Sequence, residues 1–485
     1  MTGNRPVAHT EAVSAWAAGE QRRILAVAIL ASFVAFLDGS VVNLALPAIA
    51  RDLDGDLVLQ QWVVDSYLLT LAALILVAGS ISDIFGRVRV LRFGLVVFGI
   101  ASVLALAAPS GPVLIVARLV QGVGAAFLVP SSLALINSAF DPQDQPRAIG
   151  IWTAWTGTAF VVGPLVGGLA VDLLNWRWIF ALSALPVLVT YPLSFGLSSS
   201  GRPSAGVDVL GAGLAAAGLT GMVFALIESP RLGLAHPVTG TALVVGLTCA
   251  IGFLWWQFRS TSPMVPMGMF TNRNFGAGNL VTCFVYAAVS MGMVIVALFL
   301  QEVVGFTATG AGLATLPLPL LSLFFAARVG ALSARFGPRA FMAAGPLLAA
   351  AGFLLMRPVE GDFSFWRQML PGLLLFGVGM TITVTPLTSA VLAAANPARS
   401  GIASALNNAV SRVSGLVAIA FIGVLAAGPL GYNSFHRLAT VAGIFMAVGG
   451  VTAAIGIRNP PRPARPAEPQ AIAQCRDRFG SPPGG

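Results

Sequence analysis

The sequence predicts an all-α protein that crosses a membrane many times and consists of two related halves. Hydrophobic residues make up 57% of the 485 residues and charged residues only 9%, whereas about a quarter of a soluble globular protein is charged. The stretch Gly79–Arg89 closes one long apolar segment, and a degraded copy, Gly330–Arg339, closes another 251 residues later. Gly150 and Gly401 open two further apolar segments at the same offset. We therefore expect a duplicated membrane protein.

The apolar segments define the expected helices in order. A spanning helix needs about 20 mainly apolar residues. On that criterion we expect fourteen spans, near residues 24–46, 62–82, 91–108, 113–137, 149–171, 178–197, 209–227, 238–258, 278–300, 311–333, 340–356, 366–395, 402–427 and 438–457. The first segment is too long for a signal-peptide core and contains polar residues, so we expect it to be a retained helix.

The arginine residues in the loops predict the orientation. Every basic residue of this chain is arginine. Most arginines, including those of both terminal segments, fall on one side of the expected spans. The arginines on the other side are Arg51, Arg177, Arg231, Arg357, Arg367 and Arg437. By the positive-inside rule we expect a multi-pass protein of the cell (plasma or inner) membrane with both termini in the cytoplasm.

The repeat offset divides the chain into five parts. The two glycine-rich loops follow the second and the tenth expected spans, so two helices have been added between two halves of six. We expect a cytoplasmic N-terminal tail (1–23), an N-terminal six-helix bundle (24–200), two inserted transmembrane helices (201–260), a C-terminal six-helix bundle (261–458) and a cytoplasmic tail (459–485). The last part is rich in proline, arginine and glycine, so we expect it to be disordered.

Four motifs occur in a fixed order along the first five spans. They are Leu37–Pro47, Gly79–Arg89, Arg118–Gly124, and Gly157 followed by Gly163–Gly168. In this order the chain resembles the major facilitator superfamily over roughly residues 24–457, specifically the fourteen-span drug:proton antiporters of the EmrB/QacA type. The resemblance implies two six-helix bundles with two extra central helices. It also implies export of amphipathic drugs, antibiotics or secondary metabolites in exchange for protons, by alternating access.

Two of these motifs have expected conformational roles. The loop after the second span resembles a conformational latch made of Gly79, Asp83, Gly86, Arg87 and Arg89. Its glycines allow a close helix approach and a tight reversal, and its carboxylate can be held by an arginine or by the positive N-terminus of another helix. A loop that only sets topology would explain the arginines but not the acid or the glycines.

The fifth span resembles the motif associated with exporters. Its residues are Gly157, Gly163, Pro164, Gly167 and Gly168. This composition predicts a kinked, thin helix that can contact a facing helix closely. Small residues that merely pack are the alternative.

Asp38 and Arg118 are the expected proton-coupling pair. Asp38 lies about 21 Å along its helix, which leaves on the order of 9 Å to the outer boundary of the bilayer core. Arg118 lies about 8 Å below the same boundary on the fourth span. A carboxylate whose contact with a guanidinium can be broken is able to take up and release a proton, while arginine keeps its charge. A static ion pair is the alternative.

The expected substrate cavity is lined by residues from several spans: Asp65, Trp152, Trp155, Asn407 and Arg412. Asp65 could instead be wetted at the membrane interface, near the start of its span. Arg412 could contact the substrate, or it could form hydrogen bonds between helices together with the nearby asparagines. The tryptophans could face lipid.

The sequence favours transport over other classes of function. It has no cluster of His, Asp, Glu or Cys at one depth and no nucleotide-binding G-x-x-x-x-G-K-[ST] loop, so we expect neither an enzyme with catalytic residues nor a metal site nor an organic cofactor. The net charge of +9 follows the loops rather than a nucleic-acid partner. We expect a monomer, driven by the proton gradient, whose partners are protons, an amphipathic small molecule and the lipid bilayer. A proton-coupled transporter of an ordinary metabolite is the alternative.

Overall fold

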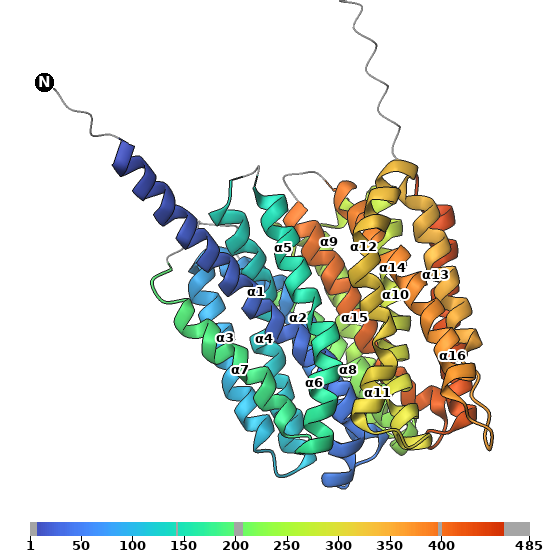
Figure 1. Ribbon diagram of the computed structural model, residues 1–485. Helices are drawn as coiled ribbons and strands as arrows, with labels where there is room; N and C mark the ends of the chain where they lie inside the picture. The colour runs from blue at the N-terminus through green and yellow to red at the C-terminus, as the bar shows by residue number, and fades with distance from the viewer. Residues whose placement is uncertain (1–6, 142–143, 198–206, 396–399, 460–485) are drawn as a thin grey trace, which may run out of the picture.

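The computed structural model describes residues 7–141, 144–197, 207–395 and 400–459, and within these ranges every regular element is a helix (Figure 1). Thirteen of the described helices are long and apolar enough to cross a membrane, and a further apolar helix, Trp178–Leu193, is shorter. The chain is therefore a multi-pass membrane protein. The first helix begins and the last helix ends at the same end of the bundle, here called the terminus end, and we call the opposite end the far end.

The first half contains seven helices. They are α1 (Val7–Asp52), α2 (Leu57–Phe85), α3 (Arg87–Leu106), α4 (Gly111–Ala139), α5 (Gln145–Gly157), α6 (Ala159–Leu173) and α7 (Trp178–Leu193). Helix α1 starts well before the predicted span, so part of the segment that we expected as a tail is helical. The predicted span 149–171 is interrupted at Thr158, directly after Gly157, because glycine weakens a helix interior.

The second half follows the same order with more breaks. Its elements are η1 (Met267–Thr271), α10 (Arg273–Leu298), η2 (Phe299–Val303), α11 (Ala308–Thr315), α12 (Pro317–Phe336), α13 (Pro338–Leu355), η3 (Phe365–Met369), α14 (Leu370–Ala393), α15 (Ser400–Ala426) and α16 (Tyr432–Gly456). The predicted span 311–333 is divided before Pro317, whose ring nitrogen cannot donate a helix hydrogen bond. The predicted disordered segment lies outside the described residues apart from Asn459.

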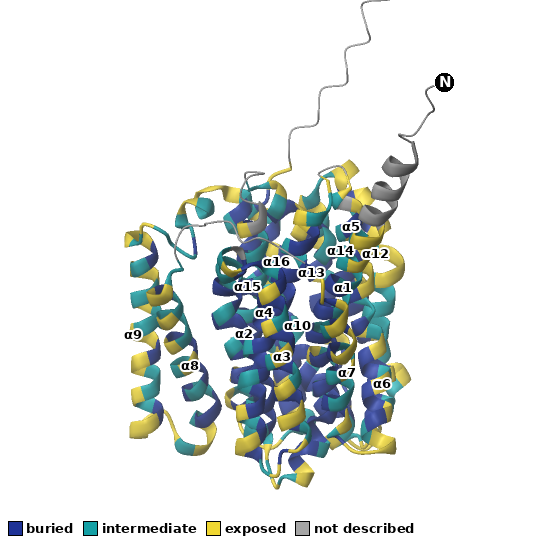
Figure 2. Cartoon of the chain, turned by 90° about the vertical axis from the view of Figure 1, so that its left-hand side faces the viewer, coloured by how far each residue is buried: buried dark blue, intermediate teal, exposed yellow. Residues whose placement is uncertain are grey.

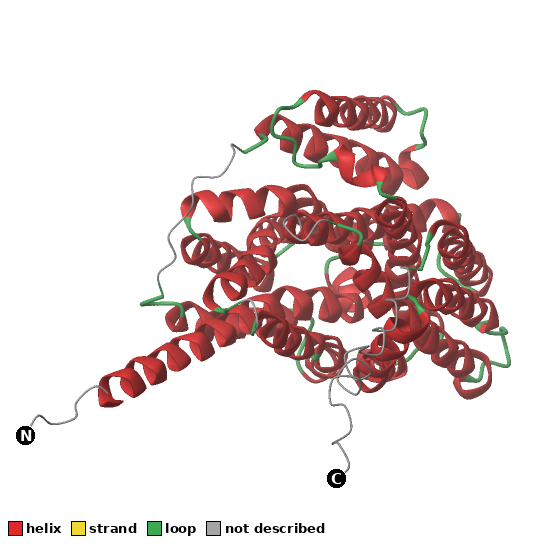
Figure 3. Ribbon diagram, turned by 90° about the horizontal axis from the view of Figure 1, so that it is seen from above, coloured by secondary structure: helices red, strands yellow, loops and turns green. Residues whose placement is uncertain are grey.

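The helices α8 (Val209–Leu232) and α9 (Pro237–Arg259) form a hairpin beside the bundle. Helix α8 packs against α9, α2 and α15, whereas α9 packs mainly against α8. Figures 2 and 3 show this pair at one edge of the molecule, outside the two halves. Among the described residues, α8 therefore makes most of the contacts between the hairpin and the two halves.

The two glycine-rich loops have the same backbone geometry, as a duplication requires. Gly86 separates α2 from α3 with φ +92°, and Gly337 separates α12 from α13 with φ +89°. A positive φ of this size strains residues that carry a Cβ. The tight reversal predicted at Gly86 is confirmed, and its degraded copy keeps the reversal.

Candidate functional site

A buried ion pair joins α1 to α4. Arg118 Nη1 lies 2.6 Å from Asp38 Oδ2, and the side chains of Arg118 and Asp38 are 1% and 0% exposed. An isolated charge at this depth would be costly, but pairing offsets much of the desolvation cost. The two residues that the sequence placed at matching depths are thus in direct contact.

Gln121 completes the binding of the carboxylate. Its Nε2 donates to Asp38 Oδ1 at 3.0 Å and to Ser102 Oγ at 3.0 Å, while its Oε1 accepts from Arg118 Nη1 at 2.6 Å. Arg118 Nε donates to the carbonyl oxygen of Val63 on α2 at 3.0 Å. Both carboxylate oxygens are therefore held by charged or polar donors. Our sequence analysis did not assign Gln121, although its position three residues after Arg118 places both side chains on one face of α4.

A glycine brings α4 close enough to α2 for these contacts. A Cβ at Gly122 would lie 2.3 Å from the carbonyl oxygen of Tyr67 and 2.1 Å from Thr70 Oγ1. The Tyr67 ring lies 4.4 Å from Arg118 Cζ and covers the guanidinium. The ion pair is consequently enclosed by three helices and an aromatic ring.

An aromatic cluster lies between the two halves, around Phe36 of α1. Its ring centroid is 5.7 Å from that of Phe160 and 6.5 Å from that of Trp152. Arg412 Cζ of α15 lies 5.9 Å from the Phe36 ring. The structure thus brings together Trp152 and Arg412 of the predicted cavity residues through Phe36, which the sequence analysis missed. Trp155 is 60% exposed and is not part of this cluster.

Asn407 and Arg412 use their side chains differently. Asn407 Nδ2 donates to Asn279 Oδ1 at 3.1 Å and to Thr282 Oγ1 at 2.8 Å, which connects α15 to α10. Arg412 has no hydrogen bond or ion pair with a described residue. The interhelical hydrogen bonds that were one alternative for Arg412 and its neighbouring asparagines are thus made by Asn407 and not by Arg412.

Asp65 does not lie at a wetted interface. Its side chain is fully buried, and neither carboxylate oxygen has a hydrogen-bond partner among the described residues. The interpretation that Asp65 is wetted is wrong, because helix α8, the first helix of the hairpin, packs over this face of α2. A hydropathy reading gives depth along a span but not what packs beside it.

The latch residues are described only in part. Arg87 Nη1 donates to the carbonyl oxygen of Ala134 at 2.8 Å, and Arg89 Nη1 contacts the carbonyl oxygen of Phe85 at 3.4 Å. The side chain of Asp83 lies outside the described residues. A Cβ added at Gly79 would meet nothing within 4 Å, so the close helix approach that we expected at Gly79 is not present in this structure.

The exporter-like motif brings α6 into close contact with both halves. A Cβ at Gly163 would lie 2.0 Å from Ser40 Oγ, and one at Gly167 would lie 2.7 Å from Val41 Cγ1, both on α1. A Cβ at Gly168 would lie 2.7 Å from the Cα of Thr309 on α11. Gly157 has no such neighbour and instead ends α5. The close packing predicted for this segment is therefore present at these three glycines but not at Gly157.

The hydrogen bonds between described residues of the two halves all lie at the far end. Gln61 Nε2 donates to the carbonyl oxygens of Ile419 and Ala420 at 2.7 and 3.1 Å. The Asp172 carboxylate of α6 accepts from the amides of Ala308 and Thr309 at 3.0 and 2.8 Å. This carboxylate thereby caps the N-terminus of α11 in the other half. The halves are thus joined at the far end.

Gln60 adds a third contact between the halves at the far end. Its Nε2 donates to Glu302 Oε1 at 2.5 Å.

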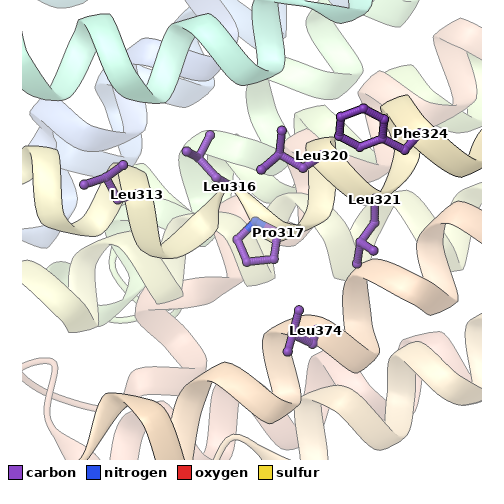
Figure 4. A pocket seen from close by; sticks show the side chains of 7 residues that line it. All are labelled: Leu313, Leu316, Pro317, Leu320, Leu321, Phe324 and Leu374. Atoms are coloured by element: carbon purple, nitrogen blue, oxygen red, sulfur yellow. The ribbon is translucent and has the colours of Figure 1, made fainter.

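An apolar groove of about 420 Å³ lies between α11, α12 and α14 (Figure 4). Its lining residues are Leu313, Leu316, Pro317, Leu320, Leu321, Phe324 and Leu374. These side chains supply no polar atom that could orient a ligand, and binding sites usually combine apolar walls with a few such groups. We therefore do not assign the substrate to this groove.

Comparisons with known proteins agree with this architecture. The model of the Major Facilitator Superfamily matches residues 28–203 and 278–482. The puromycin resistance protein pur8 of Streptomyces alboniger is 32% identical over 439 residues, which cover 89% of this chain and 87% of that protein. The methylenomycin A resistance protein of Streptomyces coelicolor is 33% identical over 451 residues, which cover 90% of this chain and 92% of that protein.

Solved structures share the fold at low sequence identity. An auto-inhibited POT family peptide transporter has a TM-score of 0.68 at 16% identity and covers 91% of this chain and 99% of its own. The xylose transporter XylE from E. coli, in a partially occluded inward-open conformation, has a TM-score of 0.61 at 15% identity. The match covers 89% of this chain and 96% of the XylE chain. Since the family match covers more than half of the residues and the resistance proteins exceed 30% identity over most of their length, this chain belongs to the Major Facilitator Superfamily.

Proposed function

We propose that this protein is a proton-coupled antiporter that exports amphipathic drugs, antibiotics or secondary metabolites by alternating access. The observation that carries the proposal is the fully buried carboxylate of Asp38, held by Arg118 and Gln121 where α1 meets α4. A carboxylate with a breakable partner inside a membrane protein is suited to carrying a proton. The relatives named for resistance to puromycin and methylenomycin A support export of small molecules.

The ion pair suggests how a proton would be exchanged. While Arg118 and Gln121 hold Asp38, the guanidinium balances the charge of the carboxylate and both of its oxygens accept hydrogen bonds. Movement of α4 relative to α1 would remove those donors and leave the carboxylate in apolar surroundings, where the protonated form is favoured. Arg118 keeps its charge throughout and therefore acts as the modulator rather than as the carrier.

We propose an orientation in which the terminus end faces the cytoplasm. The distribution of arginine supports this orientation. The far end, where Gln61 and Asp172 join the halves, is then the extracellular side. The described conformation would then be closed on the extracellular side. The latch contacts would form in the other conformation, which is closed on the cytoplasmic side.

We also propose fourteen spans, with α7 crossing the membrane and α5–α6 and α11–α12 each forming one broken span. Two facts support the inserted pair. The two segments of the family match leave residues 204–277 between them, and α8 and α9 fall in that interval.

Drug-induced proton movement in proteoliposomes tests the proposed function. Purified protein with a pH-sensitive dye in the lumen is challenged with puromycin and other amphipathic drugs, and we expect drug-dependent proton movement. Asp38→Asn keeps the side-chain size but cannot carry the proton, so we expect it to abolish that movement. Glu360→Gln, at an exposed position in the α13–α14 loop, is the matched control. Undiminished proton movement with Asp38→Asn would remove this residue from the mechanism.

A further inference from the structure

One stretch of α2 contains five buried oxygen atoms without a hydrogen-bond partner among the described residues. They are Gln60 Oε1, Gln61 Oε1, Ser66 Oγ and both carboxylate oxygens of Asp65. Buried polar atoms are usually paired, so each exception requires an explanation. The carboxyl group of Asp65 most needs an explanation, because it is the only one of these groups that can ionise.

The helical repeat shows what surrounds Asp65. Val58, Trp62, Asp65, Leu69 and Ala72 follow one another at intervals of three or four residues and thus share one face of α2. The apolar members of this face pack in one cluster with α8 and α15. The partners in that cluster include Leu219, Val223 and Ile227 of α8 and Leu416 and Ala420 of α15.

Polar contacts one turn before Asp65 fix this part of α2 between those two helices. Trp62 Nε1 donates to Glu228 Oε1 on α8 at 3.0 Å. Gln61, one turn before Asp65, donates to the carbonyl oxygens of Ile419 and Ala420 on α15. Asp65 therefore lies where the first half, the inserted hairpin and the second half meet, just inside the far-end contact.

The neighbouring charged groups do not pair with Asp65. The charged residues that interact with this part of α2, or with such a residue, are Asp38 of α1, Arg118 of α4, Glu228 and Arg231 of α8, Glu302 of η2 and Arg412 of α15. Asp38 is paired with Arg118, and Glu228 with Arg231. No ion pair within 4 Å joins Asp65 to any described residue. An unpaired ionised carboxylate in apolar surroundings is so costly that such groups hold a proton instead.

We propose that Asp65 is a second proton-binding site, separate from Asp38, which holds a proton while the far end is closed. When α2 separates from α15, water reaches the carboxyl group, its O–H bond breaks, the proton passes to water and the electron pair stays on the carboxylate. Closing the far end takes the proton up again. The proposal rests on the alternating access of the proposed function, and it makes the far end responsive to pH on that side of the membrane.

Linkage gives the size of the effect. If the closed state binds one more proton than the open state, the ratio of closed to open molecules falls by up to about tenfold for each unit of rising pH. Asp65→Asn has nearly the same shape and no proton to lose. We expect this variant to keep the far end closed at every pH.

Distance measurements between spin labels test the proposal. Cysteines replace Leu57 at the start of α2 and Ala427 just after α15, in a variant whose three native cysteines are changed to serine. The distance distribution is recorded from pH 5 to pH 9 without substrate. We expect the ratio of short to long distances to fall at least about tenfold with rising pH, and by less than about twofold in Asp65→Asn. The variant Glu360→Gln, changed at an exposed far-end position, should show the same pH response as the labelled protein without this substitution.

Three results would overturn the proposal: a distribution that does not change with pH, an equal change in Asp65→Asn, or a change that requires sodium and disappears when choline replaces it. A change that vanishes in Asp38→Asn but persists in Asp65→Asn would assign the proton to Asp38 and would also overturn it. Because no drug is present, the measurement can succeed even if drug export fails, so the two proposals can be judged separately.

Discussion

Arg118 acts through geometry as well as charge. Its Nη1 donates to both Asp38 and Gln121, while its Nε donates to the backbone of Val63 on a third helix. A planar guanidinium can reach these acceptors at once, whereas the ammonium of lysine is a single flexible donor group.

Arg118→Lys should therefore impair transport although the charge is kept. We expect the initial rate of drug uptake into inverted membrane vesicles to fall by about tenfold or more, since losing well-placed charged hydrogen bonds costs roughly 1.5–3 kcal/mol. Arg259→Lys, at the end of α9, preserves charge far from the ion pair and serves as the control. Native uptake by the Arg118→Lys variant would show that charge alone is sufficient at this position.

The sequence predicted the contact between Asp38 and Arg118 because buried charges are rare and two opposite ones fell at the same depth. Gln121 and Phe36 carry no charge, so the same reasoning gave them no weight. The burial of Asp65 was missed for a different reason. Hydropathy gives its depth along α2, but the helix that covers it belongs to a hairpin about 150 residues later in the chain.

At the scale of elements, the inserted hairpin is held together at the terminus end by Asp208. Its carboxylate accepts from Trp256 Nε1 at 2.8 Å, from Gln257 Nε2 at 2.9 Å and from the amide of Gly211 at 2.8 Å. Partial burial raises the pKa of Asp208, but these hydrogen bonds together outweigh that effect and hold the pKa below its ordinary value. Asp208 precedes α8, so it lies outside the spans.

This shift predicts how the hairpin responds to acid. A carboxyl group whose pKa is lowered on folding stabilises the protein above its unfolded pKa, and that contribution is lost as the pH falls toward the folded value. We expect hydrogen exchange in residues 209–259, corrected for the intrinsic rate, to increase as the pH is lowered from 7 toward about 4. Asp208→Asn should show faster exchange already at pH 7. Equal protection of both proteins at both pH values would contradict the role given to Asp208, and α16 provides the internal reference.

The junction of α2 with α3 carries the second prediction at this scale. Asp83 lies in the last turn of α2, and α15 begins at Ser400 on the same side of the bundle. A carboxylate docked at a helix N-terminus gains about 0.3–1 kcal/mol, and up to about 2 kcal/mol when partly buried. We expect Asp83→Asn to weaken closure of the terminus end, to shift the population toward the far-end-closed conformation and to slow turnover while drug binding persists.

Spin labels on the terminus ends of α2 and α15 would measure this shift. The control is Asp141→Asn, an exposed acid beyond α4 at the same end. If the distances with Asp and Asn at position 83 coincide, the loop is a turn that sets topology and not a latch.

At the scale of the whole molecule, the duplication and the order of the spans could be predicted because both depend on long apolar runs and on a repeated glycine-rich loop. The interruptions at Thr158 and before Pro317 could not be placed from hydropathy, because a break of one or two residues hardly changes an average over 20. The position of the hairpin beside α2 and α15 is a packing outcome. The closed far end is also a packing outcome, and sequence patterns along single helices do not record it.

Asp172 caps α11 across the boundary between the halves and is one of the contacts that join them at the far end. Removing a side-chain cap costs about 0.5–2 kcal/mol. Asp172→Ala should therefore favour the conformation that is open at the far end. Labelling of a single cysteine at Leu57 by an impermeant maleimide should become faster, with Glu360→Ala as the control. An unchanged labelling rate would mean that the contacts of Gln60 and Gln61 are sufficient to keep this end closed.

Two of the far-end contacts, those made by Gln61 and Asp172, use different kinds of group in the two halves, and this difference affects how such a protein can diverge. In each, the first half supplies a side chain, Gln61 or Asp172, and the second half supplies main-chain groups, to which the side chains of Thr307 and Thr309 add at Asp172. Every amino acid except proline offers the same carbonyl and amide, so the second half can exchange its side chains there without losing these main-chain bonds. Chimaeras that join this first half to the second half of a relative should therefore still close, which leaves the second half free to drift toward new compounds.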